Sequence, residues 1–372
     1  MTLIDPPSPR PFSRRGFLGL TGGLAGLAAL AACGSSETGG GGASSTVLTV
    51  QYFEGAGQDP VPKRILQEMP AADQNLKIEE IIGGSRWPEI LAAYKASKKA
   101  LANVGLFTGE RIAQGNALSM FRAVTQQEVP RLSAAVPAYD MFQGTGVPFN
   151  TTLIGLIYRD DLVEKPPTSW MDLLDPKYKG KVGLFDAPQG ITMSGLWAIN
   201  QALGGDPVTL DKGFEAFAKA ARDGQFGTVY NSNQTQFDAF SRGDVVIGAS
   251  MLSTQVNWTA QGAKIGYAVP REGQLANPLY LGIVESSSEA QVAAALKFVN
   301  AMLEPANVAE YNELTASGSV YSDQPAGDKF KDHPAFAQEA LTQALQVDWK
   351  VQGEALAAQS ERWNRDVKGS LG

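Results

Sequence analysis

The sequence contains a single cysteine and a single histidine among its 372 residues. One cysteine excludes a disulfide bond within the chain. One cysteine and one histidine also cannot supply a zinc site of these two residue types. A Ser-His-Asp triad would have to use His333, which lies in a Lys-Asp-His-Pro stretch typical of a surface turn and has no nucleophile-elbow motif nearby. The sequence therefore favours a protein that is not an enzyme and that carries no cofactor and no metal.

Positive charge is also scarce. Only 19% of the residues are charged, and 31 Lys and Arg stand against 38 Asp and Glu, which gives a net charge of −7. We find no basic run beyond Lys98-Lys99. Nucleic-acid binding requires clustered basic side chains, so a nucleic-acid partner is not expected.

The first 32 residues are typical of an export signal rather than of a folded element. A twin-arginine pattern, Ser13–Leu18, precedes an apolar run that ends in Leu-Ala-Ala directly before Cys33. Small residues before a lone cysteine indicate a lipobox, in which the thiol is acylated and the chain is cut just before it. We predict a twin-arginine lipoprotein signal peptide over residues 1–32, lipidation at Cys33, and a flexible Gly/Ser/Thr-rich tether over residues 33–46. The alternative, a membrane-spanning helix, is disfavoured because the apolar run is at the short limit for a span.

From Val47 onward, strand and helix patterns alternate. Strand patterns at 47–53, 76–82 and 102–107 are separated by helix patterns at 62–69 and 87–98. This order predicts a largely parallel sheet with helices on both faces. A second α/β unit follows, with the chain crossing between the units near Phe149 and again near Pro278, and the pattern after Glu289 is mainly helical.

Four segments carry a family resemblance. They are residues 158–163 (YRDDLV), 167–182 (PTSWMDLLDPKYKGKV), 237–248 and 294–305. The run from Pro-Thr-Ser-Trp to Lys-Gly, residues 167–180, is the most specific part. These segments resemble bacterial extracellular solute-binding proteins of the polyamine and ferric-iron class, which are receptors of ABC importers. The resemblance implies an α/β, two-lobe, type II periplasmic-binding-protein-like fold with discontinuous lobes joined by crossing strands. We expect lobe 1 at 47–149 with 280–325 returning, and lobe 2 at 150–279 with a helical C-terminal part at 326–372.

The resemblance also implies partners and a location. The protein would be an exported monomer, periplasmic or on the outer face of the cell membrane and anchored through the lipid on Cys33. It would deliver a small-molecule solute to the permease and ATPase subunits of an ABC transporter.

Candidate ligand-binding residues lie where strands end, because open α/β sheets bind ligands beyond the carboxyl ends of their strands. The predicted ligand-binding residues are Tyr52, Glu54, Ser85, Thr108, Thr152, Asp186, Gln189, Thr192, Asn231, Ser250 and Tyr280. Glu54 and Asp186 match positions where polyamine receptors of this class carry acids. We therefore expect Asp186→Ala to weaken ligand binding with little loss of stability.

Three interpretations of the function remain open, two of which differ in the ligand. A polyamine-like or other organic cation is favoured by Glu54 and Asp186, although a di- or tri-cation needs several buried acids to offset its desolvation. An anionic solute such as a phosphonate or carboxylate is the alternative, because glycines at 83–84 and at 190 precede or open helices whose N–H groups could bind an anion. A structural lipoprotein without a transport role is the third.

Overall fold

The computed structural model describes residues 45–371, apart from residues 56, 84–85, 187–189, 325–328 and 346. The predicted signal peptide, Cys33 and the tether up to residue 44 lie outside the described residues, and so do Ser85 and Gln189. Within the described part of the chain, no helix has both the length and the apolar character needed to cross a membrane.

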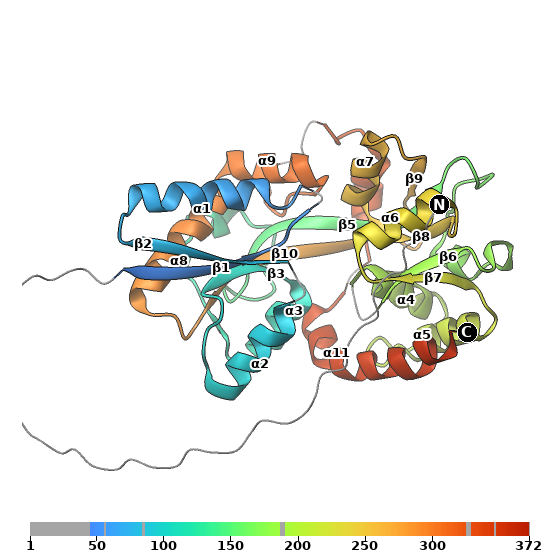
Figure 1. The fold of residues 1–372 in the computed structure, drawn as a ribbon, viewed down its shortest axis with the longest axis horizontal. Coiled ribbons are helices and arrows are strands. Elements are labelled where there is room, and N and C mark those ends of the chain that lie inside the picture. The colour runs from blue at the N-terminus through green and yellow to red at the C-terminus, as the bar shows by residue number, and fades with distance from the viewer. Residues whose placement is uncertain are drawn as a thin grey trace, which may run out of the picture. The chain divides into compact units, whose positions relative to one another are not determined.

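A mixed sheet of ten strands forms the centre of the fold (Figure 1). The order is β2-β1-β3-β10-β5-β8-β6-β7, with β4 paired to β10 and β9 paired to β5. The strands are β1 Thr46–Tyr52, β2 Leu76–Ile82, β3 Val104–Thr108, β4 Phe121–Arg122, β5 Val147–Arg159, β6 Val182–Phe185, β7 Phe226–Tyr230, β8 Ile247–Met251, β9 Ile265–Ala268 and β10 Leu275–Val284.

The sheet has two parallel halves joined by two longer strands. The first half consists of β1, β2 and β3, which are mutually parallel, and the second half consists of β6, β7 and β8, which are also parallel. The crossing strands β5 and β10 pair antiparallel with each other, β10 pairs antiparallel with β3, and β5 pairs antiparallel with β8. From β3 through β10 and β5 to β8 the strand direction reverses three times. The parallel strands of one half therefore run opposite to those of the other half. The carboxyl ends of the two halves therefore point toward each other.

Helices cover the sheet, as the alternating sequence pattern predicts. They are α1 Pro60–Ala72, α2 Trp87–Ser97, α3 Gly109–Asn116, α4 Gly190–Ala202, α5 Asp211–Arg222, α6 Asn233–Arg242, α7 Leu252–Ala260, α8 Glu289–Met302, α9 Pro305–Thr315, α10 Gln338–Thr342 and α11 Trp349–Arg362. Ser232 and Ser288 cap α6 and α8 through their side chains, which satisfies N–H groups that a helix start leaves free. The predicted α/β class with crossing strands is confirmed. Two helices were not predicted, α3 and α7, and both begin directly after a strand.

Helices α1 and α8 cover one face of the first half of the sheet. Leu48, Val50 and Tyr52 alternate along β1 and are 0% exposed. They belong to one apolar cluster with residues of α1 and α8. A second cluster lies under α4 and α5 and includes Phe217 and Trp363. Burial of such side chains stabilises the fold by about 1.5–3 kcal/mol each.

The C-terminal helix α11 contacts elements of both halves (Figure 1). Gly353 lies so near α3 that a Cβ atom there would be 2.6 Å from the Ala113 Cβ. On the other side, Gln352 and Gln359 donate hydrogen bonds to the backbone oxygens of Pro207 and Val208, at 3.1 and 3.2 Å. The predicted lobe boundaries assign the C-terminal helices to lobe 2 and stay a prediction. Helix α11 also packs on α3, which lies within the range predicted as lobe 1.

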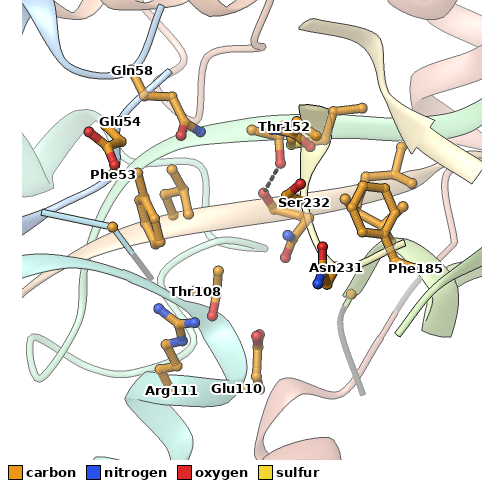
Figure 2. Close-up of a pocket in the computed structure, with 18 residues that line it drawn as sticks. Phe53, Glu54, Gln58, Thr108, Glu110, Arg111, Thr152, Phe185, Asn231 and Ser232 are labelled. Atoms are coloured by element: carbon orange, nitrogen blue, oxygen red, sulfur yellow. Dashed lines mark hydrogen bonds between the residues drawn. The ribbon is translucent and has the colours of Figure 1, made fainter. Parts of the chain in front are cut away.

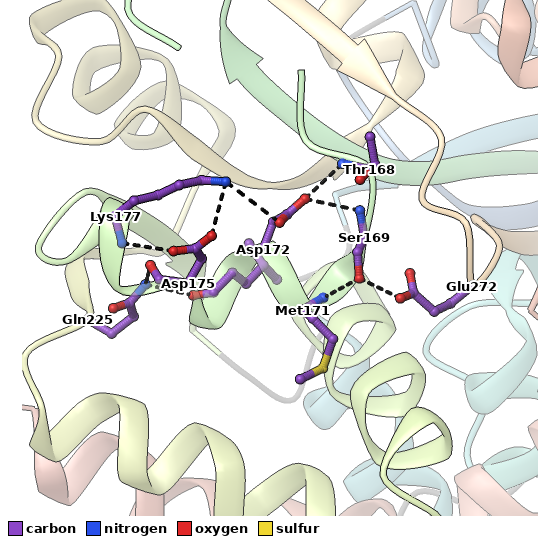
Figure 3. Close-up of polar contacts among 9 residues, drawn as sticks. Thr168, Ser169, Met171, Asp172, Asp175, Lys177, Gln225 and Glu272 are labelled. Carbon is purple, nitrogen blue, oxygen red and sulfur yellow. Dashed lines mark hydrogen bonds and ion pairs between the residues drawn. The ribbon is translucent and has the colours of Figure 1, made fainter. Parts of the chain in front are cut away.

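The Pro-Thr-Ser-Trp segment owes its character to local hydrogen bonds (Figure 3). The Ser169 Oγ accepts the Met171 N–H at 3.0 Å, and the Asp172 carboxylate accepts the N–H groups of Thr168 and Ser169 at 2.8 and 3.1 Å. The Ser169 hydroxyl also donates to Glu272. Trp170, which is 0% exposed, donates its Nε1–H to the Gly273 oxygen at 2.8 Å. The most specific part of the family resemblance is therefore a structural cap that fastens residues 168–172 to the loop before β10.

We predict that Ser169→Ala lowers the free energy of unfolding by about 1 kcal/mol, because it removes a cap oxygen that accepts a backbone N–H. Urea denaturation followed by fluorescence measures the change. Ser241→Ala, at an exposed position of α6, is the control and should change stability by less than about 0.5 kcal/mol. Equal stability of wild type and Ser169→Ala would contradict this assignment of the cap.

We predict that Gly353→Leu destabilises the protein by about 1–3 kcal/mol, because the new side chain has no space between α11 and α3. The matched control is Ala358→Leu, on the exposed side of the same helix, which should cost little. Thermal unfolding of both variants compares them. If the two variants melt together, α11 is not held tightly against α3.

Candidate functional site

A pocket of about 420 Å³ lies where the two halves of the sheet face each other (Figure 2). The first half contributes Phe53, Glu54, Gln58, Gly83, Thr108, Glu110 and Arg111. The second half contributes Phe185, Gly190, Ile191, Asn231, Ser232, Asn233 and Met251. The crossing strands contribute Thr152, Ile154, Asn277 and Leu279.

Strand direction explains this convergence. In the first half, Phe53 follows β1, Gly83 follows β2 and Thr108 ends β3. In the second half, the corresponding residues are Phe185 at the end of β6, Asn231 after β7 and Met251 at the end of β8. Each of the six parallel strands thus delivers a residue to the pocket at its carboxyl end, which is the rule for ligand sites in open α/β sheets.

Three helices begin at the pocket wall. Thr108 occupies the N-cap position of α3, Gly190 is the first residue of α4, and Ser232 caps α6 by accepting the Thr235 N–H at 3.2 Å. The Thr108 hydroxyl makes no capping hydrogen bond and is buried without a protein partner among the described residues. Helix N-termini carry partial positive charge and free N–H groups. This wall of the pocket therefore favours negative charge.

The pocket also contains side chains of both charges. The Arg111 guanidinium lies over the rings of Phe53 and Trp87, at 5.6 and 6.0 Å from their centres. Burial lowers the pKa of Arg111, and the neighbouring Glu110 carboxylate acts in the opposite direction. Arginine nevertheless remains protonated in proteins. Figure 2 shows Arg111 and Glu110 below the Phe53 ring and Glu54 above it.

Several polar atoms in the pocket have unused hydrogen-bonding capacity. Within the described residues, Glu110 Oε2 and Asn277 Oδ1 are buried and have no hydrogen-bond partner. Buried polar atoms that lack a partner cost free energy, so their presence in a pocket indicates that a ligand forms hydrogen bonds with them. A ligand with N–H or O–H donors would satisfy both oxygens.

Four of the predicted ligand-binding residues line this pocket. They are Glu54, Thr108, Thr152 and Asn231. Thr152 donates its hydroxyl hydrogen to the backbone oxygen of Asn277 at 3.1 Å, so the Thr152 hydroxyl can only accept a hydrogen bond from a ligand (Figure 2). Direct ligand contact by these four residues stays a prediction.

Four predicted residues point into the protein interior instead. Tyr52 is 0% exposed and donates to Glu80, and burial raises the pKa of its hydroxyl. Thr192 donates to the Phe185 oxygen at 2.8 Å, and Ser250 donates to Gln236 at 3.1 Å. Tyr280 is also 0% exposed and lies edge-on to Phe142. The side chains of these four residues face the core and do not line the pocket, so the structure gives no support to ligand contact by them.

Asp186 directly follows β6 and has protein partners. Its carboxylate accepts the Trp363 Nε1–H at 3.3 Å and binds the Lys368 ammonium at 2.6 Å. It therefore fastens the C-terminal segment to the end of β6 and does not line the pocket. The weaker ligand binding expected of Asp186→Ala stays a prediction, and the same change also removes this contact. Ser85 and Gln189 lie outside the described residues.

Sequence reasoning missed Arg111, the one basic side chain of the pocket among the described residues. It was missed because α3 was not predicted: the segment GERIAQGN is short and contains two glycines. The sequence did contain an indication of α3. A threonine followed by a glutamate at the end of a buried strand is typical of a helix start. Asn277 was missed because β10 begins five residues earlier than predicted, at Leu275.

In the described part of the chain, no group of three or more His, Cys, Asp or Glu side chains could hold a metal ion. The pocket itself offers two carboxylates, hydroxyls and amides around a guanidinium. A guanidinium repels a metal cation, so a metal ion is disfavoured beside Arg111.

Comparison with known proteins agrees with this geometry. A periplasmic protein of Salmonella typhimurium, provisionally named as binding 2-aminoethylphosphonate, is 24% identical over 334 residues, covering 86% of this chain and 84% of that protein. A solved ABC transporter structure from Clostridium perfringens superposes with a TM-score of 0.68 at 18% identity, covering 86% of this chain and 99% of that one.

Two further solved structures share the fold. The spermidine/putrescine substrate-binding protein PotD of Streptococcus pneumoniae gives a TM-score of 0.62 at 17% identity, and iron-bound HitA of Pseudomonas aeruginosa gives 0.67 at 16%. Each comparison covers 86% of this chain and 99% of the other. These similarities confirm the predicted two-lobe, type II periplasmic-binding fold.

The family model described as bacterial extracellular solute-binding protein matches residues 69–338, which is most of the chain. This match includes the capped Pro-Thr-Ser-Trp segment and most of the pocket residues. The chain therefore belongs to the bacterial extracellular solute-binding proteins.

Proposed function

We propose that this protein is the receptor of an ABC importer, which captures a small polar solute and delivers it to the permease without changing it chemically. The observation that carries the proposal is that the pocket takes its walls from both halves of the sheet. A solute that contacts both halves stabilises the closed form over an open one, because its contacts are complete only when the halves approach. A purely structural lipoprotein has no need of such a pocket.

The permease and ATPase of the importer would be separate chains, as predicted from the resemblance. The Clostridium perfringens structure described as an ABC transporter supports this assignment. The protein would work as a monomer outside the cell membrane, exported through its twin-arginine signal and attached through a lipid on Cys33. A lipid anchor with a flexible tether would keep the pocket near the permease.

The solute is proposed to carry both an oxyanion and an amine. Glu54 and Glu110 support the organic cation that the sequence favours, whereas Arg111 and three helix N-termini support the anionic alternative. A polyamine, which carries only positive charges, would have to approach the partly buried guanidinium, and like charges repel strongly at low dielectric. A zwitterion matches both signs, and the name of the Salmonella relative supports a 2-aminoethylphosphonate-like ligand.

We predict that the mature protein binds 2-aminoethylphosphonate more tightly than ethylphosphonate, which lacks the amine, and more tightly than spermidine. Loss of a charge-assisted hydrogen bond to a carboxylate costs about 1.5–3 kcal/mol, so ethylphosphonate should bind about 10- to 100-fold more weakly. Isothermal titration calorimetry measures the three dissociation constants.

The outcomes separate the receptor role from the ligand class. Tightest binding of spermidine would support the organic-cation alternative and refute the zwitterion, while leaving the receptor role intact. If neither these compounds nor a broad panel of solutes changes the thermal stability or the tryptophan fluorescence, the receptor role itself is refuted.

We predict that Cys33→Ser releases the protein from the membrane, because the serine hydroxyl cannot take the place of the acylated thiol. In Triton X-114 phase separation of expressing cells, the wild type should enter the detergent phase and the variant the aqueous phase. Replacing a tether residue instead, with Ser35→Ala, is the control and should leave partitioning unchanged. Equal partitioning of wild type and Cys33→Ser would exclude the lipid anchor.

A further inference from the structure

The Arg111 side chain is held by aromatic rings from two separate parts of the chain. Phe53 follows β1, and Trp87 begins α2. The guanidinium lies 5.6 Å from the centre of the Phe53 ring and 6.0 Å from the centre of the Trp87 ring. Attraction between a cation and a ring face is stronger where water is excluded, as it is for this partly buried group. Both rings therefore restrict the directions in which the guanidinium N–H groups can point.

Trp87 is itself fixed in place. Its Nε1–H donates a 2.8 Å hydrogen bond to Gln114 Oε1, and its ring lies edge-on to Phe107 with centres 5.5 Å apart. Only 7% of Trp87 is exposed, and it does not line the pocket. Gln114 lies one turn beyond Arg111 on α3. The same helix therefore presents Arg111 to the pocket and, through Gln114, orients the ring over which Arg111 lies.

We infer that Trp87 and Gln114 are positioning residues that hold Arg111 in a fixed orientation for a bidentate oxyanion of the solute. The inference rests on the proposed function and adds which residues determine specificity. A guanidinium that is already ordered loses little side-chain freedom when the ligand binds. Its planar set of N–H donors matches two oxygens of a phosphonate or carboxylate, whereas an ammonium group is a point charge.

Selectivity for the oxyanion follows from this arrangement. The N–H groups at the starts of α3, α4 and α6 can bind the remaining oxygens, while Glu54 and Glu110 are left for the amine. A solute that lacks the oxyanion would not form the charge-assisted hydrogen bonds that the guanidinium offers. The protein should therefore select for the oxyanion through Arg111 and its aromatic support.

The test uses the mature protein with five single variants, which are Arg111→Lys, Trp87→Leu, Trp87→Phe, Gln114→Met and the control Trp258→Leu. The double variant Trp87→Leu/Arg111→Lys completes the set. Trp258 is equally buried, at 7% exposure, lies on α7 and does not line the pocket. Calorimetry gives the dissociation constants for 2-aminoethylphosphonate and ethylphosphonate, and thermal unfolding reports whether each variant folds.

We expect Arg111→Lys to weaken binding of both oxyanions at least tenfold. Trp87→Leu should weaken both by about the same factor, and Gln114→Met and Trp87→Phe should do so to a smaller extent, because each keeps a ring over Arg111. Trp258→Leu should lower the melting temperature without changing either dissociation constant. In the Trp87→Leu background, Arg111→Lys should cost less than in the wild type, because the ordered orientation is already lost.

Unchanged dissociation constants in folded Trp87→Leu and Gln114→Met would overturn the positioning role. Additive effects of Trp87→Leu and Arg111→Lys would overturn it as well. If the wild type binds spermidine but neither oxyanion, the assignment of Arg111 falls while the receptor role remains. Should Trp87→Leu fail to fold, Gln114→Met and Trp87→Phe still decide the question, since both retain an aromatic ring at position 87.

Discussion

The antiparallel pairing of β5 with β10 is the constraint on which the rest of the structure depends. These strands pair from Leu275 with Ile154 to Leu281 with Val147 and run between the two halves of the sheet. Because each also pairs antiparallel with the adjoining half, the two sets of parallel strands run in opposite directions. Their carboxyl ends therefore face one another, and the loops that follow them share one pocket. The crossing strands add Thr152 and Asn277 to the same surface.

The mixed charge of this pocket decides which solutes it can hold. A single guanidinium lies among two carboxylates and several neutral polar groups, within the described residues. A polycation would meet repulsion from Arg111, and a simple anion would meet repulsion from Glu54 and Glu110. Desolvating either charge is costly unless an opposite charge takes the place of water. A small zwitterion supplies both partners, which reconciles the cationic and anionic interpretations that the sequence alone left open.

Hydrophobic patterning made the fold class predictable, because most strands and helices show a clear period and the Pro-Thr-Ser-Trp segment reads directly as a cap. The pocket was less predictable, since patterning locates the end of a strand but not the side to which the last residue points. Tyr52 ends β1 and faces the core, whereas Phe53, one residue later, lines the pocket. Asp186 follows a strand as expected, but Lys368 from the far end of the chain binds it. Contacts between distant segments leave no local pattern.

Helix α3 shows how such distant contacts determine the site. It carries Glu110 and Arg111 on the face toward the pocket, and α11 packs on it from behind. A Cβ atom at Gly109 would lie 2.6 Å from the Trp349 ring, so no other residue type fits there without a shift. The backbone that presents the guanidinium is therefore supported by the C-terminal helix, while the guanidinium itself lies over the rings of Phe53, which follows β1, and Trp87, which begins α2. Because α11 also binds the backbone at Pro207 and Val208, any movement of one half against the other must be accommodated within α11 or its contacts.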